Sequence, residues 1–372
     1  MNIEKVIVVC LAFTLFACKS IPVENKDAKT PKNVILLISD GTGLSQISSA
    51  YYFKDSSPNY SRFKNIGLIK TSSSKQDVTD SAAGATAFAS GIKTYNGAIG
   101  VADDKTDAEN IVEIVSRKNI KTGLVATSSI THATPASFYA HAVSRGLTED
   151  IAADLVTSEV DFFAGGGLKF FKDRKDGKKL LDALKQNQFS IYTNGLNEFS
   201  QIQSDKKVGY LLSDDAMPTI EKGRGDFLSK ATAQAIQFLD QEKGGFFLMS
   251  EGSQIDWGGH ENNASYLISE LIDFDDTIGK ALDYAEKDGN TLVIVTSDHE
   301  TGGFTLSAKK KKNKEGKEYS DYTEIGPTFS TGGHSATLIP VFAYGPGSEE
   351  FNGIYENNLI FEKILQLTKW NK

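Results

Sequence analysis

The chain has 372 residues, of which 40% are hydrophobic and 24% charged, with 22 Phe and 13 Tyr. This composition supplies enough apolar surface to close a core and excludes disorder over most of the length. Lys and Arg total 40 against 48 Asp and Glu, and the net charge of −8 disfavours proteins that bind nucleic acid through its phosphate backbone. The length fits either two to three domains of about 150 residues or one large α/β domain with insertions.

The N-terminus has the pattern of a signal peptide. The apolar run over residues 6–17 is shorter than the roughly 20 residues that a membrane-spanning helix needs, so we expect residues 1–17 to be cleaved. The sequence Leu15–Cys18 (LFAC) resembles the lipobox of bacterial lipoproteins, whose cysteine becomes the lipidated first residue. We expect an exported protein, either a periplasmic or outer-membrane lipoprotein held by its lipid alone, or a secreted protein, with an uncleaved anchor as the third alternative.

Cysteine content limits the chemistry of the mature chain. Cys10 and Cys18 are the only cysteines, so cleavage before Cys18 leaves no disulfide, no cysteine nucleophile and no thiolate metal site. Residues 18–32 are polar and contain two prolines, and we expect a lipidated N-terminus and tether there. Residues 33–372 are expected to form one domain.

From Asn33 onward, short β-branched runs alternate with helical patterns. The runs are apolar on both faces, as is typical of strands buried in a mostly parallel sheet, and they cover residues 33–39, 66–71, 122–127, 246–250, 291–296 and 337–344. Apolar residues at three- to four-residue spacing predict a helix over 264–284 and a closing helix over 359–367. The expected fold class is a doubly wound α/β sandwich with helices on both faces of the sheet.

Two segments are interpreted as insertions. Residues 161–219 show little strand signal and contain Gly165–Gly167, where we expect a plain turn, with phosphate binding by the backbone as the alternative. Residues 308–324 contain the lysine run Lys309–Lys312, which we expect at the solvated tip of a hairpin. Attraction of an anionic substrate or of lipopolysaccharide is the alternative role for these lysines.

Carboxylates and histidines follow the carboxyl ends of several predicted strands, where open α/β sheets bind ligands. These candidate residues are Asp40, His132, Thr134, Glu251, Asp256, His260, Asp298 and His299, with His334 in a later loop. Imidazole with carboxylate suits catalytic zinc, whereas carboxylate and hydroxyl oxygens suit magnesium, so the sequence predicts two kinds of metal site. The remaining histidine, His141, is expected to be a packed or exposed helix residue.

Ser81 is the candidate nucleophile. Small residues follow it in VTDSAAGATAFASG and predict a tightly packed helix whose first turn begins at the serine. Its oxygen would then face free N–H groups and the positive end of the helix dipole; a plain Ser or Asp helix cap is the alternative. Without a nearby histidine base, the serine needs activation by a metal. Arg145 could hold phosphoryl oxygens with its planar guanidinium, or be a surface cation.

Together these motifs resemble the alkaline phosphatase family. V-T-D-S-A-A-G-A-T-A, E-x4-D-x3-H, S-D-H-E-T-G-G and G-G-H occur in family order from about Asn33 to the last predicted strand. The short insertions make the chain most similar to the compact, cold-active bacterial members. The resemblance implies hydrolysis of phosphate monoesters through a covalent phosphoserine on Ser81, with release of inorganic phosphate.

The resemblance also implies a role for each motif residue. One zinc beside the serine would be held by Asp40, Asp298 and His299. A second zinc would be held by Asp256, His260 and His334. A third site, normally magnesium, would be completed by Asp40, Thr134 and Glu251. Asp80 would orient Arg145, and family members are commonly homodimers, although short insertions remove much of the usual interface.

Two residues that would line the substrate site depart from the best-studied bacterial pattern, which has Asp in place of His132 and Lys in place of Trp257. An imidazole at His132 could favour zinc over magnesium at the third site. Trp257 removes a cation that would help to hold phosphate through water, so we expect weaker binding of the product.

Two rival functions remain open. A phosphodiesterase or sulfatase could share the fold, but Arg145 and the third metal site favour monoesters, and no suitable cysteine is present as a sulfatase nucleophile. A lipoprotein that only captures phosphate or zinc would have no need of Ser81. The sequence selects no particular physiological monoester.

Overall fold

The computed structural model describes residues 30–197, 202, 206–241 and 243–371. The predicted signal peptide and Cys18 lie outside these residues, as does most of the predicted tether. Within the described part of the chain, no helix is both long enough and apolar enough to cross a membrane.

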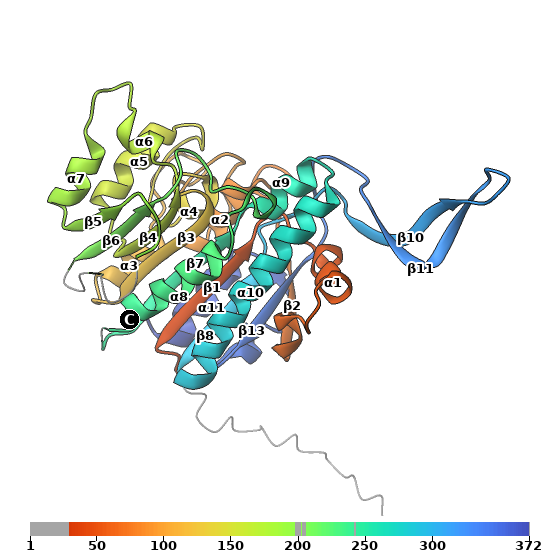
Figure 1. The fold of residues 1–372 in the computed structure, drawn as a ribbon. Helices are drawn as coiled ribbons and strands as arrows, with labels where there is room; N and C mark the ends of the chain where they lie inside the picture. Colours follow the sequence, from red (N-terminus) through yellow and green to blue (C-terminus); the bar gives the residue numbers. More distant parts are fainter. Residues whose placement is uncertain (1–29, 198–201, 203–205, 242, 372) are drawn as a thin grey trace, which may run out of the picture.

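A ten-stranded sheet forms the centre of the molecule, in the order β14-β2-β13-β8-β1-β7-β3-β4-β6-β5 (Figure 1). Its strands are β1 (Asn33–Ser39), β2 (Asn65–Lys70), β3 (Lys121–Ser129), β4 (Phe162–Gly166), β5 (Phe189–Tyr192), β6 (Lys207–Leu211), β7 (Phe246–Gly252), β8 (Thr291–Thr296), β13 (Ile339–Tyr344) and β14 (Gly353–Glu356). Only β13 pairs antiparallel, with β2 and β8; every other pairing in this sheet is parallel. The predicted mostly parallel sheet is therefore confirmed.

Helices cover both faces of the sheet. The α-helices are α1 (Leu44–Phe53), α2 (Ser81–Ser90), α3 (Ile111–Ser116), α4 (Ala133–Ala136), α5 (Thr148–Thr157), α6 (Lys169–Lys172), α7 (Leu180–Gln186), α8 (Phe227–Leu239), α9 (Gln254–His260), α10 (Ala264–Asp288) and α11 (Leu359–Thr368). Within the described residues, short 3₁₀ turns lie at Asn59–Arg62, Ile220–Lys222 and Ser348–Phe351. The predicted helix over 264–284 and the closing helix correspond to α10 and α11.

Alternate residues of the central strand β1 belong to two separate cores. Leu36 packs in the core that includes α2, α3, α5 and α11, whereas Leu37 packs in the core that includes α1, α8 and α10. All seven residues of β1 are buried, which explains why its sequence is a continuous apolar run rather than an alternating one. The arrangement is the doubly wound, three-layer sandwich expected from the sequence.

The expectation that residues 161–219 form an insertion with little strand structure is wrong. This segment supplies β4, β5 and β6, which extend the main sheet beyond β3. Gly165 and Gly166 end strand β4 instead of forming a turn, and only Gly167 has a positive φ, of 103°. A Cβ on Gly166 would lie 1.8 Å from the carbonyl oxygen of Asp215, so the glycine is needed for this close approach.

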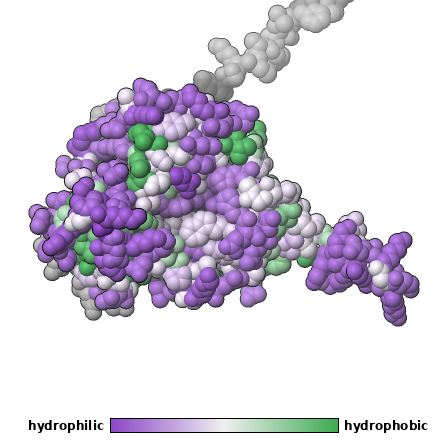
Figure 2. All heavy atoms as spheres, turned by 90° about the horizontal axis from the view of Figure 1, so that it is seen from above, coloured by the Kyte–Doolittle hydropathy of each residue, from purple (hydrophilic) through white to green (hydrophobic). Residues whose placement is uncertain are grey.

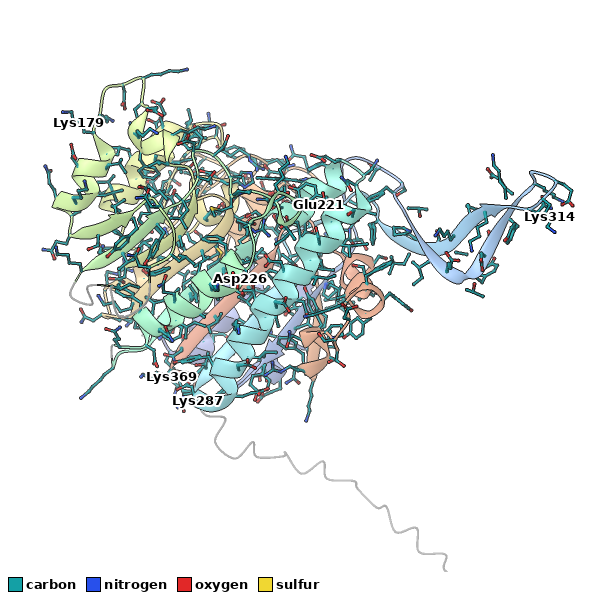
Figure 3. The ribbon with its side chains drawn as sticks, in the orientation of Figure 1. Lys179, Glu221, Asp226, Lys287, Lys314 and Lys369 are labelled. Atoms are coloured by element: carbon teal, nitrogen blue, oxygen red, sulfur yellow. The ribbon has the colours of Figure 1, made fainter. Side chains whose placement is uncertain are left out.

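The second expected insertion is a hairpin that projects from the body, made of β10 (Thr305–Lys312) and β11 (Glu318–Thr328) (Figures 1 and 2). Lys314 lies near its end in Figure 3. The lysine run Lys309–Lys312 belongs to strand β10 rather than to the tip. Lys311 pairs with Asp321 at 2.6 Å and also with Glu324, so part of the positive charge is neutralised within the hairpin.

Candidate active site

The candidate residues meet at the carboxyl ends of the central strands. Asp40 directly follows β1, Glu251 lies near the end of β7, and Asp298 follows β8. His132 precedes the short helix α4, which follows β3, and His334 begins the two-residue strand β12 (His334–Ser335), paired with β9 (Glu300–Thr301). Figure 2 views the molecule from above, onto this end of the sheet, and shows hydrophilic residues across much of it.

Two glycines allow the site loops to approach one another. Gly41 has φ +71°, and a Cβ there would lie 2.6 Å from Cα of Asp256. A Cβ on Gly84 would lie 2.9 Å from Cβ of Asp298. The absence of side chains at these positions brings helices α9 and α2 against the metal-ligand candidates.

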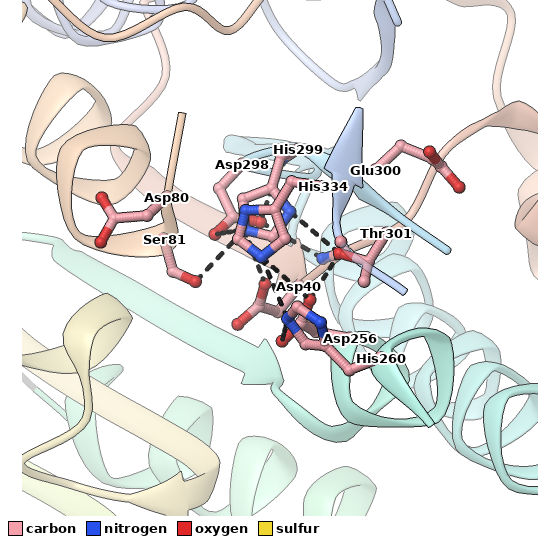
Figure 4. A network of polar contacts seen from close by, with 12 residues as sticks. Asp40, Asp80, Ser81, Asp256, His260, Asp298, His299, Glu300, Thr301 and His334 are labelled. Carbon is pink, nitrogen blue, oxygen red and sulfur yellow. Dashed lines mark hydrogen bonds and ion pairs between the residues drawn. The ribbon is translucent and has the colours of Figure 1, made fainter. Parts of the chain in front are cut away.

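Ser81 is the first residue of the buried helix α2, as the sequence predicts. Asp80 caps the helix, because its Oδ1 accepts a hydrogen bond from the N–H of Ala83 at 3.0 Å. Ser81 is 2% exposed, and its hydroxyl lies 3.2 Å from Nε2 of His299 (Figure 4). The serine oxygen therefore lies at the positive end of the α2 dipole, beside an imidazole.

Three groups of side chains could each hold a metal ion, with ligand atoms within 4.8 Å of one another: Asp40–Asp298–His299, Asp256–His299–His334 and Asp40–His132–Glu251. Asp40 and His299 each belong to two groups. His260 belongs to none of them, but its Nε2 lies 3.1 Å from Nε2 of His334 and 3.4 Å from Oδ2 of Asp256. Six of the predicted ligands thus form one continuous cluster in Figure 4: Asp40, Asp256, His260, Asp298, His299 and His334. His132 and Glu251 join this cluster through Asp40.

Buried ligand atoms of this cluster have no hydrogen-bond partner within the described residues. They are both carboxylate oxygens of Asp40, Nδ1 of His132, Oγ1 of Thr134, Oε1 of Glu251 and Oδ2 of Asp298. Buried polar atoms are nearly always hydrogen-bonded, and buried charges are paired or coordinate metals. The donor set fits cations that would satisfy these atoms.

Burial also shifts the titration of these groups. Burial and the neighbouring carboxylates raise the pKa of Asp40 well above its usual value, and burial raises the pKa of Glu251 to about 7. Burial lowers the pKa of His132 and of His299 to about 3. His132 and His299 are therefore neutral at ordinary pH, and a bound cation would favour the ionised carboxylates.

Further contacts orient the imidazole rings, and the sequence did not predict them. The Thr301 hydroxyl lies 3.2 Å from Nδ1 of His299 and donates to Oδ1 of Asp256 at 2.5 Å. Nδ1 of His334 lies 2.8 Å from the carbonyl oxygen of Thr79, and Nδ1 of His260 lies 2.7 Å from that of Gly332. Each ring then presents Nε2 to the cluster, as metal-binding histidines with such outer partners do.

Arg145 lies beside the candidate nucleophile Ser81, against the preceding residue Asp80. Its Nη1 donates to Oδ2 of Asp80 at 3.1 Å, and its Nη2 lies 3.2 Å from Nε2 of His132. Trp257, on α9, contacts the His132 ring edge-on, with centroids 5.9 Å apart and an interplanar angle of 79°. The structure therefore brings Asp80, Arg145, His132 and Trp257 to the same side of the metal-ligand cluster.

His141 does not lie in a helix, contrary to expectation. It is half-buried in the irregular segment after α4, where its Nδ1 lies 2.6 Å from the carbonyl oxygen of Gly100 and its Nε2 lies 3.1 Å from Oε1 of Glu113. The hydrogen bond to Glu113 is the main cause that raises the pKa of His141 to about 9. It takes no part in the metal-ligand cluster.

Comparisons with known proteins agree with this geometry. The family model for alkaline phosphatase matches residues 31–312. Alkaline phosphatase 3 of Bacillus subtilis is 34% identical, with 97% of this chain and 95% of that protein covered. The alkaline phosphatase of the Antarctic bacterium TAB5 is 73% identical with a TM-score of 0.90, covering 92% of this chain and 99% of that one.

Two further solved structures bear on the site and the fold. A TAB5 variant in which a histidine is replaced by aspartate, with Mg bound in its M3 site, is 74% identical with a TM-score of 0.91, covering 92% of this chain and 99% of that one. The cold-active alkaline phosphatase of a Shewanella species is 28% identical with a TM-score of 0.80, covering 90% and 99% of the two chains. This chain belongs to the alkaline phosphatase family.

Proposed function

We propose that this chain is an exported, metal-dependent alkaline phosphatase in which Ser81 is the nucleophile and forms a covalent phosphoserine. One observation carries the proposal. The Ser81 hydroxyl stands at the start of a buried helix, 3.2 Å from an imidazole nitrogen, beside a cluster of buried ligand atoms that have no hydrogen-bond partner in the described part of the chain. A binding protein for phosphate or zinc would need the cluster but not the serine.

Each residue then has a defined task in the reaction. Ser81 Oγ loses its proton and forms a bond to phosphorus while the bond from phosphorus to the alcohol oxygen breaks, and the departing alcohol oxygen takes up a proton. Water then loses a proton and forms a new bond to phosphorus, the bond to Ser81 Oγ breaks, the serine oxygen regains a proton, and inorganic phosphate leaves. Arg145, held by Asp80 at 3.1 Å, binds non-bridging oxygens in both steps, and the N–H groups of α2 favour the anionic serine oxygen.

We assign the metals as two zinc ions and one magnesium ion per chain. Asp40, Asp298 and His299 would hold the first zinc, and Asp256, His260 and His334 the second. Asp40, Thr134 and Glu251 would hold magnesium, with zinc as the alternative because of His132. Bound in this way, the metals would neutralise phosphate charge and lower the pKa values of the attacking oxygens. The buried ligand atoms without hydrogen-bond partners among the described residues support the first zinc site and the third site. The second zinc site is supported by the approach of His260 and His334 to the carboxylate of Asp256, at 3.4 and 3.7 Å.

Replacing His132 by aspartate is expected to shift the third site towards magnesium, because a carboxylate replaces the imidazole nitrogen that favours zinc. The TAB5 variant with the same type of replacement and bound Mg supports this expectation. The measurement is metal content after dialysis against equal zinc and magnesium. Magnesium bound per chain should rise in the variant, and an unchanged ratio of the two metals would count against the assignment.

Replacing Trp257 by lysine is expected to tighten inhibition by inorganic phosphate by about ten-fold, which corresponds to about 1.4 kcal/mol. The ammonium group would attract the bound anion, whereas the indole of Trp257 offers it no full charge. Inhibition constants of wild type, Trp257→Lys and the neutral control Trp257→Gln should be compared. Equal or weaker inhibition in the lysine variant would refute the interpretation of Trp257.

We also propose a lipid anchor at Cys18, periplasmic or outer-membrane location, and a homodimer. The lipobox-like sequence supports the anchor, and loss of lipid labelling in Cys18→Ser would test it.

The proposed homodimer is supported by exposed apolar side chains on α1 and the hairpin, which could contact a second copy: Leu44 is 61%, Tyr52 64% and Tyr322 89% exposed. Light scattering would measure the oligomeric state, and a monomer at all concentrations would exclude the dimer.

The reaction itself can be tested with a chromogenic aryl phosphate, the matching diester and the matching sulfate at alkaline pH. Each is assayed before and after chelation, with zinc and magnesium restored separately. We expect rapid monoester turnover that is lost on chelation and recovered mainly by zinc. If folded, zinc-loaded protein leaves the monoester intact, the site serves another ester or binding alone.

A further inference from the structure

A single turn, Tyr95–Gly97, makes hydrogen bonds to two parts of the proposed phosphate site: the stretch that precedes Ser81 and the segment that carries Arg145. The side chain of Asn96 spans the extended stretch directly before the nucleophile: its Oδ1 accepts from the N–H of Asp80 at 3.2 Å, and its Nδ2 donates to the carbonyl oxygen of Val78 at 3.0 Å. The amide thus pairs with this stretch as a neighbouring peptide group would. It holds the backbone of Asp80 extended, with φ −103° and ψ 171°, at the point where α2 begins.

The same turn holds the backbone of the arginine. The carbonyl oxygen of Gly97 accepts from the N–H of Arg145 at 2.7 Å, and the Tyr95 hydroxyl donates to the carbonyl oxygen of Val143 at 2.9 Å. Gly97 has φ +89°, a conformation that favours glycine and allows the chain to turn at this position. Asp80 and Arg145 are far apart in sequence, and this turn fixes both of their backbones.

The side chains of Asp80 and Arg145 are also hydrogen-bonded to each other. Asp80 uses its Oδ1 to cap α2 and its Oδ2 to accept from Nη1 of Arg145, so a small rotation of the Asp80 backbone would disturb both the helix start and the guanidinium. The Arg145 side chain is 32% exposed, so packing alone does not fix it. Its orientation therefore depends on its contacts with Asp80 and His132, and the first of these depends on the backbone of Asp80.

We propose that Asn96 is a positioning residue for phosphate binding, acting through Asp80 on both Ser81 and Arg145. The inference rests on the proposed roles of Ser81 and Arg145. Asn96 itself bonds backbone atoms of Val78 and Asp80 rather than a metal-ligand candidate. Because the carbonyl oxygen of Thr79, between these two residues, lies 2.8 Å from Nδ1 of His334, activities are compared between proteins that hold equal amounts of zinc. Misplacement of a reacting group by about 1 Å can lower the rate about 100-fold, which makes this indirect role measurable.

The test compares Asn96→Ala with a matched control, Asn358→Ala. Asn358 makes the same kind of bond at the opposite end of α2, where its Nδ2 donates to the carbonyl oxygen of Gly91 at 3.0 Å. We expect Asn96→Ala, compared with wild type at equal zinc content, to lower kcat/KM by about 10- to 100-fold and to weaken phosphate inhibition. Asn358→Ala is expected to retain wild-type kcat/KM, and an equal loss in both variants would overturn the proposal.

Two further variants separate positioning from general destabilisation. Asn96→Asp keeps the size and the acceptor for Asp80 N–H but loses the donor to Val78, so wild-type kcat/KM and phosphate inhibition in this variant would overturn the proposal. In a double-mutant cycle, most of the Asn96→Ala effect should vanish in the Arg145→Ala background, because the group being positioned is gone. Additive losses would contradict the inference. Failure of the proposed function would be distinct, since zinc-loaded wild type would then lack monoester turnover.

Discussion

Replacing Ser81 by alanine is expected to lower turnover of an aryl phosphate monoester by at least about 10³-fold. The variant lacks the oxygen that forms the bond to phosphorus, and the neighbouring His299 lies among the metal-ligand candidates rather than free to replace it. The hydrogen bond of the Ser81 hydroxyl goes to His299 in the metal-ligand cluster, so its loss should not disturb the packing of helix α2. Zinc content and the thermal midpoint should therefore stay close to those of wild type.

Ser90→Ala is the matched control for this prediction. It removes a hydroxyl from the last residue of the same helix, where Oγ of Ser90 donates to the carbonyl oxygen of Ala108 at 3.3 Å. Turnover by the control should stay near that of wild type. Phosphate covalently trapped on the Ser81→Ala protein would show that another residue is the nucleophile.

Replacing Asp40 by asparagine is expected to remove metal from two sites at once and to lower monoester turnover by at least about 10²-fold, since even outer partners of metal ligands contribute about 10- to 100-fold. Asp40 belongs to two of the three potential ligand groups, and neither of its carboxylate oxygens has a hydrogen-bond partner among the described residues. The amide is neutral and offers one weakly basic oxygen, so it cannot replace a carboxylate shared between cations.

Metal content and turnover of Asp40→Asn should be measured beside Asp103→Asn. Asp103 is an exposed carboxylate that pairs with Lys75 at 2.8 Å, away from the cluster, so the same replacement there should leave zinc bound. An Asp40→Asn protein with wild-type zinc content and turnover would exclude Asp40 as a shared ligand.

The central part of the fold could be predicted because its strands are buried on both faces. β1, β7 and β8 are continuous apolar runs, and each is followed within a few residues by a carboxylate or a histidine. Since parallel strands end at the same edge, short motifs distant in sequence were expected to meet there. The structure places Asp40, Glu251 and Asp298 together at that edge.

The edge of the sheet could not be predicted in the same way. β5 has four residues and β6 contains a glycine, so neither gives a clear apolar run. Their strand conformation depends on pairing with each other and with β4, which local sequence does not encode strongly. The segment was therefore interpreted as an insertion.

The supporting contacts of the site were also hidden from the sequence. Thr301 stands inside the S-D-H-E-T-G-G motif, which was a usable signal, but its bonds to His299 and Asp256 depend on two loops meeting in space. Asn96 has no such signal, because its side chain bonds only backbone groups of a preceding segment. Residue type identifies candidate ligands, whereas the groups that orient them emerge only from the folded chain.

Acid quenching during turnover tests most directly whether Ser81 carries the phosphoryl group. Zinc-loaded wild type is mixed with labelled aryl phosphate at mildly acidic pH, where hydroxide for the second step is scarce, then quenched, digested and examined by mass spectrometry. The proposed mechanism predicts label on the peptide that contains Ser81. Ordinary monoester turnover with no label on any peptide would contradict it and indicate direct attack by water.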